Sequence, residues 1–283
     1  MTIHTALLED RGVLRVAGEE AASFLQGLLT NDVESLAVGD ARYAALLSPQ
    51  GKILFDFLVL RAPVESGTAF LIDAPAAQLG DLAKRLGFYR LRAKATISDE
   101  SAAQAVVAFW GASPPGVPGV LSYPDPRDPR LGARAILPRA QAAALIVGAG
   151  DEYEAHRINL GVPKGGADFA YADIFPHDAN LDLLHGVDFE KGCYVGQEVV
   201  SRMRHRGGVR KRILRLALAG AAPERGTPVL AGEIAVGALG SAADGRALAL
   251  LRLDRVEDAR AAGLALTAGG VGVKIEAADL ADV

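Results

Sequence analysis

The sequence predicts an α+β fold with antiparallel strands and helices in its N-terminal part and a small β-barrel or sandwich at its C-terminal end. Three observations lead to this prediction. Apolar residues near position 25 have the spacing of an amphipathic helix, and two apolar runs flank a Pro/Gly turn at residues 48–51. Short aliphatic runs broken by glycine and proline follow residue 210.

The N-terminal elements follow from periodicity. Residues 13–16 are predicted to form a short strand. A helix that ends at the turn formers 30–32 is predicted from apolar residues at i, i+3, i+4, i+7 and i+8, namely Ala21, Phe24, Leu25, Leu28 and Leu29. The runs 43–47 and 53–60 are joined by Ser-Pro-Gln-Gly, which indicates an antiparallel hairpin.

Further elements are predicted along the chain. Residues 68–73 indicate a strand, and residues 79–86 indicate a helix that stops at Gly87. Short strands are expected at residues 95–98, 105–110 and 133–137. The stretch between the last two holds six prolines, which exclude a regular helix and a central strand, so we expect an exposed connector at residues 111–130.

The second half of the chain contains two predicted helices. Its sequence pattern changes after residues 206–210. Asp151 and Glu154 fit a helix N-terminus, and Gly161 with Pro163 supply the stop, so residues 152–160 should be helical. Beyond residues 206–210, where a domain boundary is expected, only one helical piece is predicted, near residues 256–262.

Composition and charge narrow the class of protein. The 283 residues carry a net charge of −4, so the overall field gives no reason to expect non-specific binding to nucleic acid. No apolar run reaches the ~18–20 residues that span a bilayer, and no membrane partner is expected. The N-terminal stretch has neither a basic region nor a continuous apolar region, which predicts no targeting peptide and a cytoplasmic location.

Motifs of several common enzyme classes are absent from the sequence. It has no GxxxxGKS/T loop, strand-borne GxGxxG, GxSxG elbow or HExxH helix, which argues against the usual nucleotide-binding, hydrolase and zinc-protease classes. The single cysteine, Cys193, excludes a disulfide framework and a cysteine cluster supplied by this chain alone. The five histidines show no metal-ligand spacing, and no metal site is predicted.

Asp56 is the first candidate functional residue, because all its neighbours in the run 53–60 are apolar. A strand buried on both faces would place this carboxylate in a low dielectric, which raises its pKa unless hydrogen-bond donors satisfy it. Carboxylates so placed are usually paired or functional. The alternative is that Asp56 faces water on an edge strand or caps a nearby backbone group.

Cys193 lies in the segment VDFEKGCYVGQE, residues 187–198, before a predicted helix that runs through Met203. Gly192 and Gly196 permit a tight backbone path there. The positive end of the helix dipole and the ammonium of Lys191 would lower the pKa of the thiol and favour the reactive thiolate. The alternative is that Cys193 is a small buried hydrophobe, which is the commoner fate of a free cysteine.

Two further polar segments are candidates for ligand contact. Residues 201–212 carry six basic side chains that suit anionic carboxylates or RNA phosphates, or that only keep a strand entrance soluble. No aromatic residues alternate with them, so RNA is the weaker interpretation. Residues 176–182 form a polar turn whose acid and amide groups would bind a heterocycle or simply hold the turn.

KGCYVGQE at residues 191–198 matches the KGCYxGQE signature of the YgfZ family, and the chain resembles this family from its N-terminus to about residue 212. Supporting segments are FLQGLLTNDV at 24–33, LSPQGKILFD at 47–56, RINLGVP at 157–163 and NLD at 180–182. YgfZ proteins are relatives of the glycine-cleavage aminomethyltransferase, or T-protein. The resemblance implies a T-protein-like aminomethyltransferase folate-binding fold of the α+β class, with mixed or antiparallel sheets and a C-terminal β-barrel.

The resemblance also implies a division into domains. Residues 1–206 would form the T-protein-like folate-binding region, built from two interleaved α+β subdomains with the proline-rich connector at 111–130. Residues 207–283 would form the C-terminal β-barrel domain.

Site residues follow from the resemblance position by position. Tyr43 and Asp56 match the tyrosine and aspartate that T-protein sets around its folate, and Cys193 matches the motif cysteine that T-protein lacks. Asn159 stands where T-protein has a pterin-holding acid, which argues against T-protein activity because an amide cannot accept from two N–H donors as a carboxylate does. The implied catalytic residues are Cys193, Asp56 and Lys191, and the implied cofactor-binding residues are Tyr43, Asp56, His156, Asn159, Asn180, Tyr194, Gln197, Glu198, Arg202 and Arg206.

The function implied is that of a tetrahydrofolate-binding factor for assembly or repair of iron–sulfur proteins, which supports tRNA modification indirectly. Its cofactor would be tetrahydrofolate or a one-carbon derivative, with a transient iron–sulfur cluster at Cys193. Its partners would be folate and iron–sulfur client or assembly proteins, with tRNA a weaker candidate. Two alternatives stay open: a tetrahydrofolate-dependent aminomethyl- or methyltransferase, and a folate-sensing tRNA-binding module built on residues 201–212.

Overall fold

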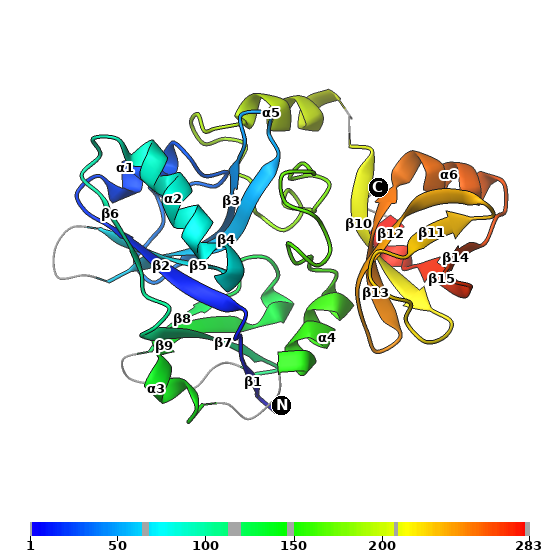
Figure 1. The fold of residues 1–283 in the computed structure, drawn as a ribbon, viewed down its shortest axis with the longest axis horizontal. Coiled ribbons are helices and arrows are strands. Elements are labelled where there is room, and N and C mark those ends of the chain that lie inside the picture. Colours follow the sequence, from blue (N-terminus) through cyan, green and yellow to red (C-terminus); the bar gives the residue numbers. More distant parts are fainter. Residues whose placement is uncertain (1, 64–67, 113–119, 146–149, 207–208, 281–283) are drawn as a thin grey trace. The chain divides into compact units, whose positions relative to one another are not determined.

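The computed structural model describes residues 2–63, 68–112, 120–145, 150–206 and 209–280 (Figure 1). The chain forms two compact units that alternate along the sequence. The first holds Met1–Tyr153 and Leu184–Gln197, and the second holds Glu154–Leu183 and Glu198–Val283. The division into domains at residues 206 and 207 stays a prediction.

A five-stranded antiparallel sheet forms the centre of the first unit. Its strand order is β3-β4-β5-β2-β6. The strands are β2 (Arg11–Ala17), β3 (Ala41–Leu47), β4 (Ile53–Ala62), β5 (Ala69–Pro75) and β6 (Thr96–Asp99). The strands predicted in these places, and the hairpin around residues 48–51, are therefore confirmed.

Two helices pack on one face of this sheet (Figure 1). They are α1 (Ala21–Gln26) and α2 (Leu79–Arg90), which follows the 3-10 turn η1 (Ala76–Gln78). Leu25 of α1 and Leu82 and Leu86 of α2 share one apolar core with the sheet. The predicted stop at Gly87 is wrong: α2 continues to Arg90, because a glycine inside a helix costs only about 1 kcal/mol and the packed turns before it offset this.

A second, four-stranded antiparallel sheet completes the first unit. Its order is β1-β7-β9-β8. The strands are β1 (His4–Leu7), β7 (Gln104–Trp110), β8 (Leu121–Pro124) and β9 (Ala133–Pro138), with η2 (Pro129–Leu131) and α3 (Arg139–Ala142) beside them. β8 was not predicted, and it lies at the sheet edge, where proline is tolerated.

The proline-rich segment is not exposed throughout, which corrects one prediction. Tyr123, Asp125 and Arg127 are buried. The physical reason is ion pairing, because Arg127 and Asp125 neutralise each other and Arg134 of β9 also pairs with Asp125 inside the unit. Residues 113–119 of this segment lie outside the described residues.

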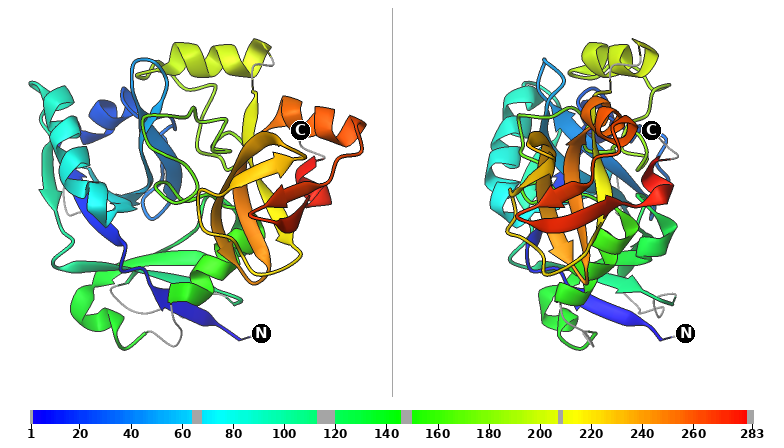
Figure 2. Two further views of the ribbon diagram at one scale, coloured as in Figure 1. Left: turned by 45° about the vertical axis from the view of Figure 1, so that its right-hand side comes forward. Right: turned by 90° about the vertical axis from the view of Figure 1, so that its right-hand side faces the viewer.

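A closed six-stranded barrel dominates the second unit (Figure 2). Its order is β10-β13-β12-β11-β14-β15. The strands are β10 (Lys211–Leu218), β11 (Pro228–Ala231), β12 (Ile234–Ala243), β13 (Arg246–Arg252), β14 (Leu266–Ala268) and β15 (Val271–Ile275). The predicted helical piece is α6 (Leu253–Ala261). The structure therefore confirms the barrel and rules out the sandwich.

The remaining helices are α4 (Gly150–Leu160), α5 (Gln197–Arg206) and α7 (Ala277–Leu280). The first two confirm the helices predicted at residues 152–160 and up to Met203. Within the described ranges, no helix is both long and apolar enough to cross a membrane.

Candidate functional site

The face of the five-stranded sheet that points away from α1 and α2 carries polar side chains. Tyr43 on β3 and Asp73 on β5 both pair with Leu58 of β4, and Asp56 precedes Leu58 by two residues. Because side chains alternate across a strand, all three point to the same face. The intervening Phe57 belongs to the apolar core on the other face.

Tyr43 and Asp56 form a buried pair on this face. The hydroxyl of Tyr43 donates a hydrogen bond of 2.9 Å to Oδ2 of Asp56, and the two residues are 2% and 5% exposed. Burial, and then the charge of Asp56, raises the pKa of Tyr43 well above its usual value. The prediction of a buried carboxylate on a doubly covered strand is confirmed, since β4 lies between β3 and β5 rather than at the edge.

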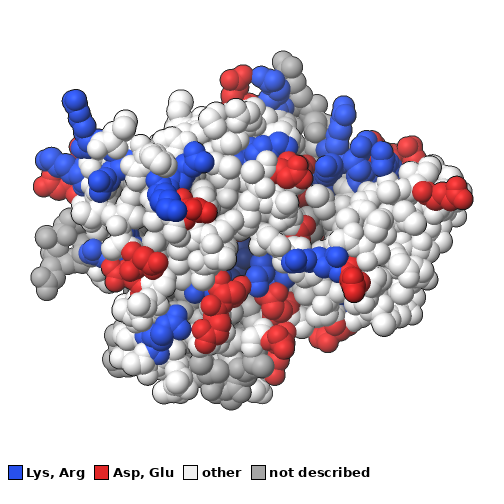
Figure 3. Space-filling view, viewed as in Figure 1, with Lys and Arg blue, Asp and Glu red and all other residues white. Residues whose placement is uncertain are grey.

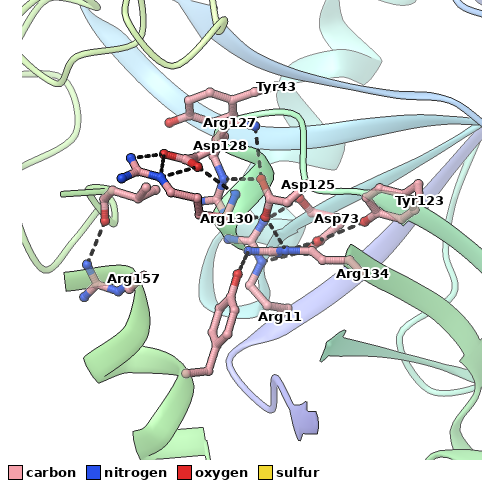
Figure 4. Close-up of polar contacts among 12 residues, drawn as sticks. Arg11, Tyr43, Asp73, Tyr123, Asp125, Arg127, Asp128, Arg130, Arg134 and Arg157 are labelled. Carbon is pink, nitrogen blue, oxygen red and sulfur yellow. Dashed lines mark hydrogen bonds and ion pairs between the residues drawn. The ribbon is translucent and has the colours of Figure 1, made fainter. Parts of the chain in front are cut away.

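An ion-pair network lies beside this pair (Figure 4). Asp73 accepts from Arg11 and Arg134, each at 2.6 Å. Asp125 accepts from the guanidinium of Arg127 at 2.9 and 2.7 Å, from the main-chain N–H of Arg127 at 3.1 Å, and from Arg134 at 3.1 Å. Arg134 therefore bridges the two carboxylates.

The network holds both carboxylates in the charged form. Burial alone would raise the pKa of Asp73, but Arg11 and Arg134 outweigh it and lower that pKa. Burial is likewise outweighed at Asp125, where Arg127 and Arg134 hold the pKa far below its usual value. A buried charge is tolerated only when it is paired and hydrogen-bonded in this way.

Sequence reasoning missed this network, although two signals for it were present. Asp73 sits in an apolar strand, just as Asp56 does, and the same argument applies to both. Asp125 and Arg127 alternate with prolines in a segment that was interpreted as solvent-exposed. Periodicity does not show which of these charges meet, because the Arg134–Asp73 pair joins strands of different sheets.

The KGCYVGQE segment is anchored to the first unit by Lys191. Its ammonium donates to the main-chain oxygens of Gln26, Leu29 and Asn31, at 2.7, 2.6 and 3.0 Å. The same ammonium lies 5.2 Å from the ring centroid of Tyr194. Burial lowers the pKa of Lys191 to about 8. This geometry supports a positioning role, and the catalytic role of Lys191 stays a prediction.

Cys193 is exposed and forms no disulfide. The alternative of a small buried hydrophobe is therefore wrong for this residue. Helix α5 begins four residues later, at Gln197. Gly196 has a φ of +84°, and a Cβ there would lie 2.6 Å from the carbonyl oxygen of Ser48. Only glycine therefore lets the motif segment approach the turn between β3 and β4 this closely.

Residues 30 and 31 connect the chain just before the motif segment to the strand that carries Tyr43. The hydroxyl of Thr30 donates to the main-chain oxygen of Gly186 at 2.6 Å and accepts from the main-chain N–H of Ala45 at 2.8 Å. Asn31 donates to the main-chain oxygens of Tyr43 and His185, at 2.8 and 2.6 Å. The signature segment at residues 24–33 is thus joined, within the first unit, both to β3 and to the chain just before the motif segment.

Three other predicted contacts belong to the second unit. His156 and Asn159 lie on α4, where Oδ1 of Asn159 accepts a 2.8 Å hydrogen bond from Arg246. Asn180 is buried, has a φ of +60°, and donates to the main-chain oxygen of Ile213 at 2.7 Å. Within the described residues, Oδ1 of Asn180 has no hydrogen-bond partner, so it keeps an acceptor available.

The polar turn at residues 176–182 is held by its own side chains and by Arg212. Asp178 accepts from the main-chain N–H of Phe175 at 3.0 Å, and Asp182 receives a two-pronged pair from Arg212 at 2.7 and 2.8 Å. This favours the turn-holding interpretation for those two acids. The ion pair with Asp182 also shows that Arg212 is not one of the solvated basic residues of the segment 201–212.

The remaining contacts predicted in the motif region and the basic segment differ in their exposure. Glu198 and Arg202 are exposed and form an ion pair of 2.8 Å one helical turn apart. Tyr194 is buried and Gln197 half-buried. The side chain of Arg206 lies outside the described residues.

Comparisons with known proteins agree with this architecture. Residues 9–115 match the family described as the GCVT N-terminal domain, and residues 210–282 match that described as the CAF17, C-terminal beta-barrel domain. The fold is similar to that of the glycine cleavage system aminomethyltransferase T from Bartonella henselae, with a TM-score of 0.76 at 16% identity over 97% of this chain and 85% of that one. The fold and the two matched domains define a protein of the aminomethyltransferase fold class with a CAF17-type barrel.

Curated relatives give a narrower assignment. An iron-sulfur cluster assembly factor IBA57 homolog of Mycosarcoma maydis is 39% identical over 77% of this chain and 58% of its own length. The IBA57 proteins of Mus musculus and Homo sapiens are 33% and 35% identical, over 77% and 73% of this chain and 67% and 64% of their own lengths. The chain belongs to the CAF17/IBA57 family, and it spans roughly three fifths to two thirds of the length of these relatives.

The same relatives correct one prediction. Each of the three is named as a mitochondrial protein, which contradicts the cytoplasmic location expected from the N-terminal sequence. The physical reason for the error is that the absence of a targeting pattern in one stretch of sequence is weak ground for a location.

Proposed function

We propose that this protein is a YgfZ-like, tetrahydrofolate-binding factor for assembly or repair of iron–sulfur proteins, which supports tRNA modification indirectly. The observation that carries the proposal is the exposed thiol of Cys193, on a segment tied by Lys191 and Asn31 to the strand of Tyr43. The relatives named as iron-sulfur cluster assembly factors support the same role.

The side chains around Tyr43 have the chemistry that a reduced pterin requires. A pterin carries ring N–H donors and a carbonyl acceptor. The carboxylate of Asp56 is an acceptor for an N–H group, and the buried phenol of Tyr43 holds that carboxylate in place. The residues therefore fit the heterocycle. Tetrahydrofolate would supply the one-carbon carrier, and Asp56 would orient its reactive end.

The thiol of Cys193 would act together with groups from a partner. This chain has one cysteine, whereas iron–sulfur clusters are held by several thiolates or histidines. A cluster that passes through this site would therefore take its other ligands from a client or assembly protein. Lys191 keeps the segment in place while the thiol remains accessible.

Folate binding is tested by titrating the purified protein with tetrahydrofolate under anaerobic conditions in a calorimeter. Asp56→Asn keeps the shape of the side chain and removes its charge, so we expect an affinity at least about tenfold lower. Asp258→Asn, at an exposed position on α6, is the matched control and should bind as the natural protein does. Equal affinities for all three proteins would remove Asp56 from the site.

The role of the thiol is tested by complementation. A strain that lacks its own family member is given the natural gene or a Cys193→Ser gene, and the activities of its iron–sulfur enzymes are measured. We expect the natural gene to restore these activities and Cys193→Ser to leave most of the defect. Full restoration by the serine variant, at equal protein abundance, would show that the thiol is not required.

A further inference from the structure

Two large apolar side chains at the C-terminal end of α2 are exposed to solvent. Phe88 is 76% exposed and Leu91 is 87% exposed, the highest values among the exposed large hydrophobic residues that the structure describes. The opposite face of α2 is buried through Leu79, Leu82 and Leu86. Phe88 therefore lies on a side of α2 that does not pack into the core, and Leu91 follows directly after the helix.

The backbone at Leu91 makes this exposure unusual. Its φ is +44° and ends the helix. Residues with a Cβ avoid positive φ, and a strained residue of this kind persists only where its surroundings impose it. Glycine would end the helix here without that cost. The chain instead places a leucine that is 87% exposed at this position.

Positive charge surrounds the two apolar side chains. Five exposed cations lie on α2 and in the turn after it, namely Lys84, Arg85, Arg90, Arg92 and Lys94. Figure 3 shows Lys and Arg side chains, with some Asp and Glu among them, in the region at the upper left where Figure 1 places α2 and β6. We name Phe88, Leu91 and these five cations the α2 patch.

Few of these charges are neutralised. Lys84 contacts Asp81 at 3.4 Å, and Lys94 contacts Glu19 at 3.0 Å. Arg85 and Arg92 form no hydrogen bond or ion pair with the part of the chain that the structure describes. The α2 patch is thus basic on a protein whose net charge is −4. A partner that matches it is anionic and can also accept apolar side chains.

We propose that the α2 patch binds the surface of an anionic lipid bilayer. Interfacial helices place Phe and Leu at the boundary of the acyl chains, while Lys and Arg meet the anionic headgroups. The long cation stems let their charged ends stay in the headgroup layer as the apolar side chains enter. Surface binding of this kind needs no membrane-spanning helix.

A bilayer fits the α2 patch better than RNA does. Single-stranded RNA is bound by aromatic side chains on which bases stack. Leu91 has no ring, and it is the more exposed of the two apolar residues. The inference does not depend on folate or on Cys193. Its test is therefore separate from the tests of the proposed function.

The test is flotation of the full chain with phosphatidylcholine vesicles that contain or lack phosphatidylglycerol. We expect binding to the anionic vesicles only, and a decrease as salt is raised, because salt screens exposed charges. Phe88→Ser with Leu91→Ser should weaken binding at least about tenfold. Arg85→Glu with Arg92→Glu should abolish it.

The control is Ile234→Ser, which removes an apolar side chain that is 60% exposed on β12 of the barrel and should bind as the natural protein does. Thermal unfolding of each variant checks that the fold is intact. Equal binding to both kinds of vesicle, or no binding to either, would overturn the proposal. RNA binding that requires Arg85 and Arg92 but not Phe88 and Leu91, without vesicle binding, would also overturn it.

Discussion

The guanidinium of Arg127 lies over the ring of Tyr43, 5.7 Å from its centroid. Tyr43 in turn donates to Asp56. Arg127 comes from the proline-rich segment after β8, whereas the other two residues come from β3 and β4. The candidate folate-binding pair is therefore covered by a residue of the four-stranded sheet region, and the proline-rich segment contributes to the site rather than only connecting strands.

The ion-pair network beside this contact is closely connected. The guanidinium groups of Arg11, Arg127 and Arg134 donate to the carboxylates of Asp73 and Asp125. In a low dielectric, the loss of any one partner leaves an uncompensated charge. The network should therefore be sensitive to single substitutions.

Asp73→Asn tests this sensitivity. Arg11 and Arg134 would lose their shared carboxylate inside the unit, so we expect the free energy of unfolding to fall by about 3–5 kcal/mol. Urea denaturation followed by circular dichroism measures it. Asp81→Asn, whose side chain is 75% exposed, should change stability by less than about 0.5 kcal/mol. A small effect at Asp73 would mean that the buried network adapts without it.

The same carboxylates predict how stability depends on pH. The pKa values of Asp73 and Asp125 are lowered in the folded protein, so the unfolded chain binds protons first as the pH falls. Their contribution is complete above the unfolded pKa of about 3.9 and is lost as the pH decreases toward the folded values. Unfolding free energies measured from pH 6 to pH 3 should therefore decline most below about pH 4. A flat profile would contradict this account.

Two arginines of the predicted basic segment should behave differently. Arg212 is buried and paired with Asp182, whereas Arg202 is exposed and paired with Glu198. We expect Arg212→Ala to lower the unfolding free energy by about 3 kcal/mol or more, and Arg202→Ala to change it by about 0.5 kcal/mol or less. Thermal and urea unfolding of the two variants compare them directly. Equal losses of unfolding free energy in the two variants would contradict the prediction that only Arg212 has a structural role.

Lys191→Met tests the anchoring of the motif segment. The variant keeps an apolar stem but leaves the main-chain oxygens of Gln26, Leu29 and Asn31 without their donor. We expect faster amide hydrogen exchange in residues 26–31 and 185–193, and a stability loss of about 1–3 kcal/mol. Mass spectrometry localises the change. Lys274→Met, at an exposed position, is the control, and unchanged exchange at the motif would show that Lys191 is not its anchor.

Local patterns predicted most of the secondary structure because local forces dominate there. The Pro/Gly turn at residues 48–51 and the apolar runs beside it specify the β3–β4 hairpin, and the helical spacing around Leu25 specifies α1. The boundary of α2 was less predictable. Gly87 lowers helix propensity, but the packing of Leu82 and Leu86 against the sheet carries the helix past it.

The proline-rich segment shows where local reasoning fails. Its composition indicates an exposed connector, and proline does keep β8 at the sheet edge. Burial of Asp125 and Arg127 depends instead on Arg134 and Asp73, and the Arg134–Asp73 pair spans 61 residues of sequence. A pattern that is read along one strand does not contain that contact.

The sequence by itself determined the antiparallel hairpin, a small β-rich region after residue 210 and the motif that surrounds Cys193, because turn chemistry, period-2 alternation and short signatures are local properties. Only the tertiary structure decided that Tyr43 meets both Asp56 and Arg127, that Lys191 donates to three main-chain oxygens, and that Cys193 is exposed. Those facts depend on sheet register and on long-range electrostatics, which pair residues from distant segments once they share a low-dielectric interior.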